Sequence, residues 1–165
     1  MFIGIDESNN GRTPLIVVAV ASELRKDILE CKGLKKYRKK NGNMRSLYNK
    51  MAKRDYKFLL IEAQNPKDIK NVVPRIYQDL LFPSLNKDKL EVFIDGDQKG
   101  IEEILRFPGV SITIHYGHNF DTKIPLVNIA DGIANYIYHK YKEIGIDGLI
   151  RKENFKKHLV GILYL

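Results

Sequence analysis

The sequence contains few residues of the kinds on which secreted and membrane proteins depend. Its single cysteine, Cys31, excludes an internal disulfide framework and a zinc site with paired cysteine ligands. No apolar run approaches the roughly 20 residues that a transmembrane helix needs. The amino terminus lacks the basic and then apolar layout of a signal peptide. We therefore expect a cytoplasmic protein that has no membrane partner.

Acidic residues are fewer than basic residues. The chain has 28 lysines and arginines against 20 aspartates and glutamates, which gives a net charge of +8 and a pI near 9.4. This balance favours an anionic partner, and nucleic acid is the commonest one. The length of 165 residues and the hydrophobic content of 44% are enough for one core, so we expect a single domain over residues 1–165.

Apolar and β-branched runs predict the strands, and apolar stripes at spacings of three and four predict the helices between them. The first run ends in two adjacent carboxylates, Asp6 and Glu7, and the fourth run ends in Asp95. The expected strands are Phe2–Glu7, Pro14–Ala21, Tyr56–Glu62, Leu90–Asp95 and Val110–His115, and the expected helices cover residues 69–81, 101–105 and 124–142.

This order of elements predicts an α/β fold. Three antiparallel strands followed by strand–helix crossovers give a mixed five-stranded sheet flanked by helices, because each crossover places its strands parallel. A basic insertion at about residues 23–54 and a carboxyl-terminal extension at about residues 143–165 lie outside this frame. If the first and fourth strands are parallel neighbours, Asp6 and Asp95 meet at one edge of the sheet.

A carboxylate at the end of a buried strand needs a partner, which is usually a metal ion or a hydrogen-bond network. Asp6 could instead begin a turn that residues 9–11 complete. A third acid, Asp131, lies among apolar positions of the long helix, where charged residues are seldom buried unless they are paired or bound to metal. Alternatively, Asp131 lies on a polar flank of that helix with Asn128 and Asn135.

Together these features resemble the ribonuclease H-like superfamily, and type 2 ribonuclease H in particular. The type 2 enzymes carry Gly-Arg-Gly directly after Asp-Glu, whereas this chain has Ser8-Asn9-Asn10-Gly11-Arg12. The resemblance covers most of the chain up to about Lys142. The motifs that carry it are Gly4-Ile5-Asp6-Glu7, a lysine-rich stretch, Asp95-Gly96, and Asp121-Thr122-Lys123 ahead of the helix that contains Ile129-Ala130-Asp131.

The resemblance implies a nuclease that depends on Mg²⁺ or Mn²⁺. Two-metal hydrolysis of a phosphodiester needs carboxylates that hold hard cations about 4 Å apart. Asp6 would bridge the ions, Asp95 would flank them, and Glu7 would be a second ligand or orient the water. Asp121 takes the remaining position by similarity to the type 2 enzymes, and Asp131 takes it by similarity to a group of uncharacterised small ribonuclease H-like proteins. We expect Asp131, because a helix fixes a ligand better than a loop does.

The part of the insertion from Lys32 to Arg54, here called the basic segment, predicts a surface that binds nucleic acid. Six of the twelve residues from Lys32 to Asn43 are basic, and no acidic residue occurs between Cys31 and Arg54, so this charge has no local partner. Tyr37 could add stacking on a base. An ordinary solvated surface is the alternative. The residues expected to hold the substrate are Lys35, Lys36, Arg38, Lys39 and Lys40.

Two classes of function are consistent with these patterns. The first is a metal-dependent endonuclease that hydrolyses RNA, an RNA:DNA hybrid or structured DNA, since a protein that only bound phosphates would gain nothing from clustered carboxylates. The alternative is a non-catalytic nucleic-acid-binding module with a ribonuclease H-like fold. His115 and His118 could protonate the leaving group, although a histidine in a strand or loop is more often structural. Asp97, beyond the end of the fourth strand, is a weaker ligand candidate.

Overall fold

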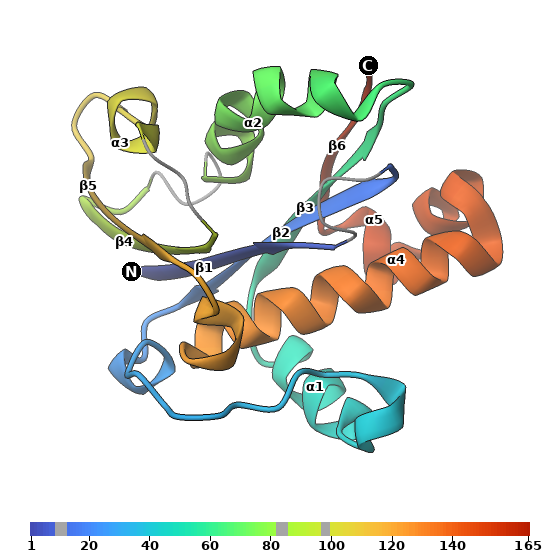
Figure 1. Ribbon diagram of the computed structural model, residues 1–165, viewed down its shortest axis with the longest axis horizontal. Coiled ribbons are helices and arrows are strands. Elements are labelled where there is room, and N and C mark those ends of the chain that lie inside the picture. Colours follow the sequence, from blue (N-terminus) through green and yellow to red (C-terminus); the bar gives the residue numbers. More distant parts are fainter. Residues whose placement is uncertain (9–12, 82–85, 97–99) are drawn as a thin grey trace.

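The computed structural model describes residues 1–8, 13–81, 86–96 and 100–165. Its centre is a mixed sheet of six strands in the order β5-β4-β1-β2-β3-β6 (Figure 1). The strands are β1 (Phe2–Glu7), β2 (Leu15–Ser22), β3 (Tyr56–Glu62), β4 (Lys89–Asp95), β5 (Ser111–Gly117) and β6 (Leu159–Tyr164).

The pairing of the strands confirms the expected mixed topology. β1 is antiparallel to β2, and β2 is antiparallel to β3. β1 is parallel to β4, and β4 is parallel to β5, as crossover connections require. The expected number of strands was one too low. The sixth strand, β6, comes from the carboxyl-terminal extension and pairs in parallel with β3, so it covers an edge that would otherwise leave backbone groups unpaired.

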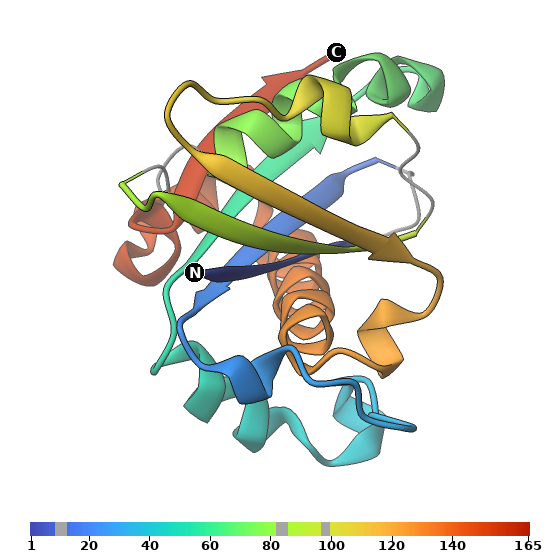
Figure 2. The same cartoon turned by 90° about the vertical axis from the view of Figure 1, so that its left-hand side faces the viewer.

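Helices cover both faces of this sheet. The helices α1 and α4 lie against one face, and α2 and α3 lie against the other; Figure 2 shows α4 nearly end-on beneath the sheet. None of the helices in the described ranges is long and apolar enough to cross a bilayer. The helices are α1 (Met44–Met51), α2 (Pro66–Leu81), α3 (Ile101–Ile104), α4 (Pro125–Arg151) and α5 (Glu153–Lys156), with short 3₁₀ turns at Arg25–Asp27, Lys39–Asn41 and Phe120–Thr122.

The alternation of side chains along the strands builds a separate core on each face. Val18, Phe58 and Leu60 face α4, where they meet Leu126 and Ile133. Full burial of each such side chain contributes about 1.5–3 kcal/mol to folding. The opposite core contains Ile3, Ile5, Leu59, Ile76, Leu80 and Val92, and it joins the sheet to α2.

A glycine sets the close approach of β1 to α4. A Cβ atom on Gly4 would lie 2.7 Å from the backbone carbon of Leu126, so only glycine fits between the strand and the first turn of the helix. The helix α4 is longer than the expected 124–142 and is interrupted at Gly145, whose φ of 66° and ψ of −178° are not helical. The contact at Gly4 places the first turn of α4 directly against β1, two residues before Asp6.

Candidate metal centre

The parallel pairing of β1 with β4 brings two strand-end acids together. Ile5 is the partner of Ile94, so Asp6 and Asp95 follow side by side at the same edge of the sheet. Asp121 joins them from the turn after β5. Each of these three side chains offers a carboxylate oxygen, and the three oxygens all lie within 4.8 Å of one another. The convergence expected for Asp6 and Asp95 is therefore observed.

The turn at Phe120–Thr122 is held in place by hydrogen bonds to the carboxylate of Asp95. The backbone N–H of Phe120 donates to Oδ1 of Asp95 at 2.6 Å, and the N–H of Asp121 donates to the same oxygen at 3.4 Å. The side chain of Asn128 on α4 donates to the carbonyl oxygen of Asp121 at 2.6 Å. Asp95 thus orients the turn with one of its oxygens, and the turn holds Asp121 against it.

Burial and mutual repulsion make this group of acids electrostatically unfavourable by itself. Burial raises the pKa of Asp6 well above its usual range, and the charges of Asp131, Asp95 and Asp121 add to that rise, while the N–H of Glu7 opposes it. Burial and the charge of Asp121 likewise raise the pKa of Asp95, against the N–H groups of Phe120 and Asp121. A bound cation would offset both causes.

The donor atoms fit a hard divalent cation. Oδ1 of Asp6 accepts the N–H of Glu7 at 2.7 Å, but Oδ2 of Asp6 is buried and has no hydrogen-bond partner in the described part of the chain. Such an unsatisfied buried oxygen is costly. Mg²⁺ and Mn²⁺ prefer carboxylate oxygens. Asp6, Asp95 and Asp121 are the residues that could hold the ion.

Asp131 lies outside the close group formed by Asp6, Asp95 and Asp121. It is buried on α4, but its carboxylate is held by Arg38, which donates to Oδ2 at 3.0 Å and to Oδ1 at 2.9 Å. The structure thus brings Asp121, rather than Asp131, into the close group with Asp6 and Asp95. This proximity favours Asp121 over the expected Asp131, and the turn that carries Asp121 is itself held by hydrogen bonds. Asp131 remains near enough for its charge to act on Asp6.

Lys36 pairs with Asp121 in the same way that Arg38 pairs with Asp131. Its ammonium group forms an ion pair with Oδ2 of Asp121, although its side chain is 44% exposed. Partial burial tends to lower the pKa of Lys36, but the hydrogen bond to Asp121 and the charges of Asp131, Asp121 and Asp6 outweigh burial and raise it. Lys36 and Arg38 therefore have no acidic partner nearby in the sequence, but each is paired with an acid that is distant in the sequence.

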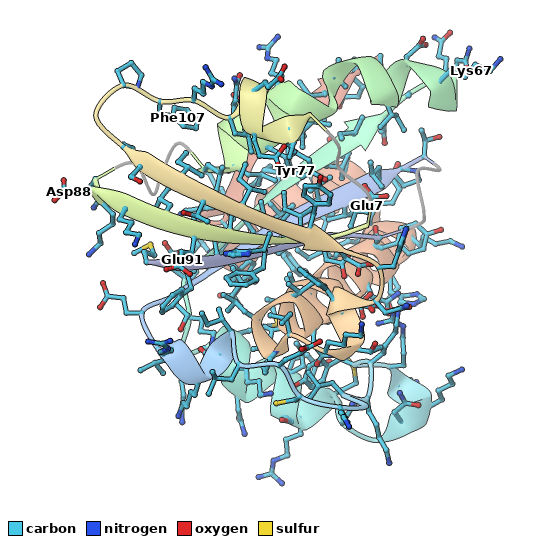
Figure 3. All side chains as sticks on the ribbon, turned by 60° about the vertical axis from the view of Figure 1, so that its left-hand side comes forward. Glu7, Lys67, Tyr77, Asp88, Glu91 and Phe107 are labelled. Atoms are coloured by element: carbon cyan, nitrogen blue, oxygen red, sulfur yellow. The ribbon has the colours of Figure 1, made fainter. Side chains whose placement is uncertain are left out.

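Glu7 does not join the three clustered acids. Successive side chains of a strand point to opposite faces, so Glu7 lies on the α2 side of the sheet while Asp6 faces α4. Figure 3 shows Glu7 near Tyr77 of α2. Burial raises the pKa of Tyr77, and the charge of Glu7 is the next largest cause. Glu7 is therefore outside the group of three carboxylates, and its expected role as a second ligand or in orienting the water stays a prediction.

The rest of the basic segment divides into exposed and buried side chains. Lys35, Lys39 and Lys40 are exposed, and a cavity of about 730 Å³ beside the clustered acids is lined by Lys35, Lys36, Arg38, Lys40 and Asn41. Tyr37 is buried against Gly132 of α4, so it is not available for stacking on a base.

The remaining candidates lie apart from the acids or outside the described residues. His115 is exposed and stacks on Phe93 with ring centroids 4.6 Å apart. His118 is exposed in the loop after β5. Asp97 and the stretch 9–12 fall outside the described ranges. Asn128 was missed as a supporting residue, and its signal was a polar side chain at a buried position of the long helix.

Comparison with solved structures supports the fold described above. No family model matches the sequence, and no curated protein matches it. The structure is similar to a chain in the complex of PCNA with RNase HII from Archaeoglobus fulgidus, with 21% sequence identity, a TM-score of 0.54, and coverage of 95% of this chain and 84% of that one. It is also similar to ribonuclease H2 from Pyrococcus horikoshii OT3, with 18% identity, a TM-score of 0.47, and coverage of 94% of this chain and 83% of that one. The chain has a ribonuclease H-like fold that resembles type 2 ribonuclease H.

Proposed function

We propose that this protein is a divalent-metal-dependent nuclease that hydrolyses phosphodiester bonds in RNA, an RNA:DNA hybrid or structured DNA. The observation that carries the proposal is the unsatisfied, buried Oδ2 of Asp6, which lies in a group of three carboxylates whose oxygens are within 4.8 Å of one another. A fold similar to that of an RNase HII supports the same class of chemistry. The expected cytoplasmic setting belongs to this proposal as well.

Each acid has a distinct part in the proposed site. Asp6, Asp95 and Asp121 would hold one or two Mg²⁺ or Mn²⁺ ions, which when bound supply Lewis acidity and an activated water. Asp6 is central because it is the most deeply buried strand-end acid and both other carboxylates approach it. Asp95 also fixes the turn that presents Asp121. Asp131 acts through Arg38, which it holds beside the site.

The basic segment would position the substrate. Lys35, Lys39 and Lys40 are exposed and attract phosphates without reading sequence. Lys36 and Arg38 bring positive charge directly beside the carboxylates. This charge reduces the repulsion between the carboxylates and an approaching phosphate. These residues would bind and orient the scissile phosphate, while the carboxylates and their ions would support the attack of water.

One observation favours the alternative, a nucleic-acid-binding module without catalysis. Lys36 and Arg38 already neutralise two of the acids, so the centre is partly satisfied without an ion. The two functions separate on the effect of metal. A binding module holds nucleic acid equally well with and without Mg²⁺, whereas the nuclease breaks the strand only with the metal.

The test is a cleavage panel of single-stranded RNA, RNA:DNA hybrid, duplex DNA and duplexes with a single ribonucleotide, each with Mg²⁺, with Mn²⁺ and with EDTA. We expect metal-dependent cleavage of at least one substrate, and its loss in Asp6→Asn. Glu30→Gln, at an exposed acid outside the three-carboxylate group, is the matched control and should keep full activity. If none of the substrates is cleaved with either metal, the proposal is wrong.

A further inference from the structure

A second cavity lies on the side of α4 away from its first turns. It has a volume of about 380 Å³, within the range of small-molecule sites, and is lined by residues of α1, α4 and α5, the start of β3 and the turn before β6. Figure 1 shows where these helices lie relative to the sheet. Among the described residues, no acidic side chain lines it. The residues that line it are Tyr48, Met51, Ala52, Tyr56, Tyr136, Lys140, Lys152, Asn154, Phe155, Lys157 and His158.

One wall of this cavity is aromatic. Tyr48 of α1 is 47% exposed, and its ring meets the ring of Tyr136 edge to face at 5.4 Å between centroids. Phe155 of α5 lies behind Tyr136 at 6.0 Å, and His158 stacks on Tyr56 at 3.8 Å. Exposed tyrosine supported from behind by other rings is a rigid surface for a flat, unsaturated ligand.

The rim of the cavity is cationic. Lys152 and Lys157 are exposed, and neither forms an ion pair with a residue in the described ranges. Lys140 is paired with Glu143, one turn along α4. Two unpaired ammonium groups beside an aromatic wall favour a ligand that is both planar and anionic.

The cavity also lies in line with the candidate metal centre. Gly132, Tyr136 and Lys140 are spaced four residues apart, so they share one face of α4. Tyr37 of the basic segment packs on Gly132, the first residue of this row. Tyr136 follows Asp131 by five residues, or about 7.5 Å along the helix axis. The basic segment and the aromatic wall therefore lie on the same side of α4.

We propose that the cavity between α1, α4 and α5 binds an unpaired nucleotide, with its base against Tyr48 and Tyr136 and its phosphate near Lys152 and Lys157. The proposal extends the proposed function, because it assigns a place to a single-stranded part of the nucleic acid beyond the cleavage position. A paired base does not fit this arrangement, since its faces are already covered by its neighbours in the duplex.

Binding is measured in EDTA, so that cleavage does not contribute. The probe is a short fluorescein-labelled oligothymidylate, followed by anisotropy over a series of salt concentrations. Tyr48→Leu keeps an apolar side chain but loses the stacking face, and it should weaken binding at least about fivefold. Tyr48→Phe should bind as the native protein does. Tyr164→Ala, at a tyrosine 67% exposed outside the cavity, is the matched control and should have no effect.

The lysines have a separate readout. Lys152→Gln with Lys157→Gln should reduce the slope of log affinity against log salt by about 0.7 for each phosphate that is no longer neutralised. Lys26→Gln, at an exposed lysine outside the cavity, should leave the slope unchanged. If Tyr48→Leu and the double lysine variant both bind with native affinity and native salt slope, the inference is wrong.

Two further measurements separate the possibilities. Saturation-transfer NMR with thymidine monophosphate shows whether a free nucleotide suffices, in which case Tyr48→Leu abolishes the signal, or whether the nucleotide must belong to a strand, in which case only the oligonucleotide binds. Asp6→Asn should bind the oligonucleotide normally. If the native protein binds the oligonucleotide but cleaves none of the substrates, only the nuclease function is contradicted. If the native protein cleaves but Tyr48→Leu binds as the native protein does, only this inference is contradicted.

Discussion

Arg38 donates hydrogen bonds to both carboxylate oxygens of Asp131, at 3.0 and 2.9 Å, across a sequence separation of 93 residues. The side chain of Asp131 is 8% exposed and that of Arg38 is 24% exposed, so this ion pair is largely shielded from water. It attaches the basic segment to α4 beside the three clustered acids. Both the stability of the fold and the position of the proposed substrate surface therefore depend on it.

Arg38→Met should destabilise the protein, because it leaves the buried charge of Asp131 without its main partner. The expected loss in the free energy of unfolding is about 3 kcal/mol, at the lower end of the range for buried pairs because Arg38 is partly exposed. Urea denaturation measures it. The double variant Arg38→Met/Asp131→Leu should recover most of the loss. Equal stability of Arg38→Met and the native protein would show that the pair does not form.

Gly132→Ala should displace the basic segment from α4. A Cβ atom at this position would lie 2.8 Å from the Cβ atom and ring of Tyr37 and 3.0 Å from the side chain of Leu47. Such overpacking costs about 1–3 kcal/mol, which thermal or urea unfolding detects. Gly161→Ala is the control, because a Cβ atom there meets nothing within 4 Å. If both variants unfold at the same denaturant concentration, Tyr37 does not pack on the helix as described.

Replacing Lys35, Lys39 and Lys40 by glutamine should weaken nucleic-acid binding nearly equally for all sequences. These lysines are exposed, unlike the partly buried Arg38, and Lys36 is excluded from the set because it is paired with Asp121. On duplex DNA the salt slope should fall by about 0.9 for each phosphate that the variant no longer neutralises, as fluorescence anisotropy can show. Affinity for Mn²⁺ should not change. An unchanged slope would mean that the substrate enters elsewhere.

The protein should lose stability on acidification partly through His158. Burial lowers the pKa of His158 below its usual value of 6.5, against a hydrogen bond to the carbonyl oxygen of Tyr56. The unfolded chain then binds more protons than the folded chain as the pH falls below about 6.5, so this contribution is present above that pH and is lost below it. Unfolding midpoints measured from neutral to mildly acidic pH should fall less steeply in His158→Gln. Identical slopes would contradict the assignment.

Local patterns in the sequence were sufficient for most of the sheet. Runs such as Phe2–Glu7 and Tyr56–Glu62 are strands in the structure with the same bounds. The proximity of Asp6 and Asp95, which end β1 and β4, could be predicted because neighbouring parallel strands have their carboxyl ends at the same edge of the sheet. These features depend only on residues adjacent in sequence and on general rules of connection.

Features that depend on distant contacts were not predictable. β6 is specified by pairing Leu159 with Phe58, and nothing within Leu159–Tyr164 indicates that partner. The partners of Lys36 and Arg38 lie far along the chain, so a segment without local acids looked unneutralised. The position of Asp121 beside Asp6 and Asp95 depends on hydrogen bonds that Asp95 accepts and Asn128 donates, and nothing in the loop sequence indicates these partners.

The most direct test of the candidate metal centre is a calorimetric titration of Mn²⁺ into the native protein, Asp121→Asn and Asp131→Asn at neutral pH. The central claim is that Asp6, Asp95 and Asp121 hold the cation and that Asp131 acts through Arg38. We expect saturable binding to the native protein, a loss of at least about tenfold in affinity in Asp121→Asn, and a smaller loss in Asp131→Asn. Absence of binding to the native protein, or a larger loss in Asp131→Asn than in Asp121→Asn, would contradict it.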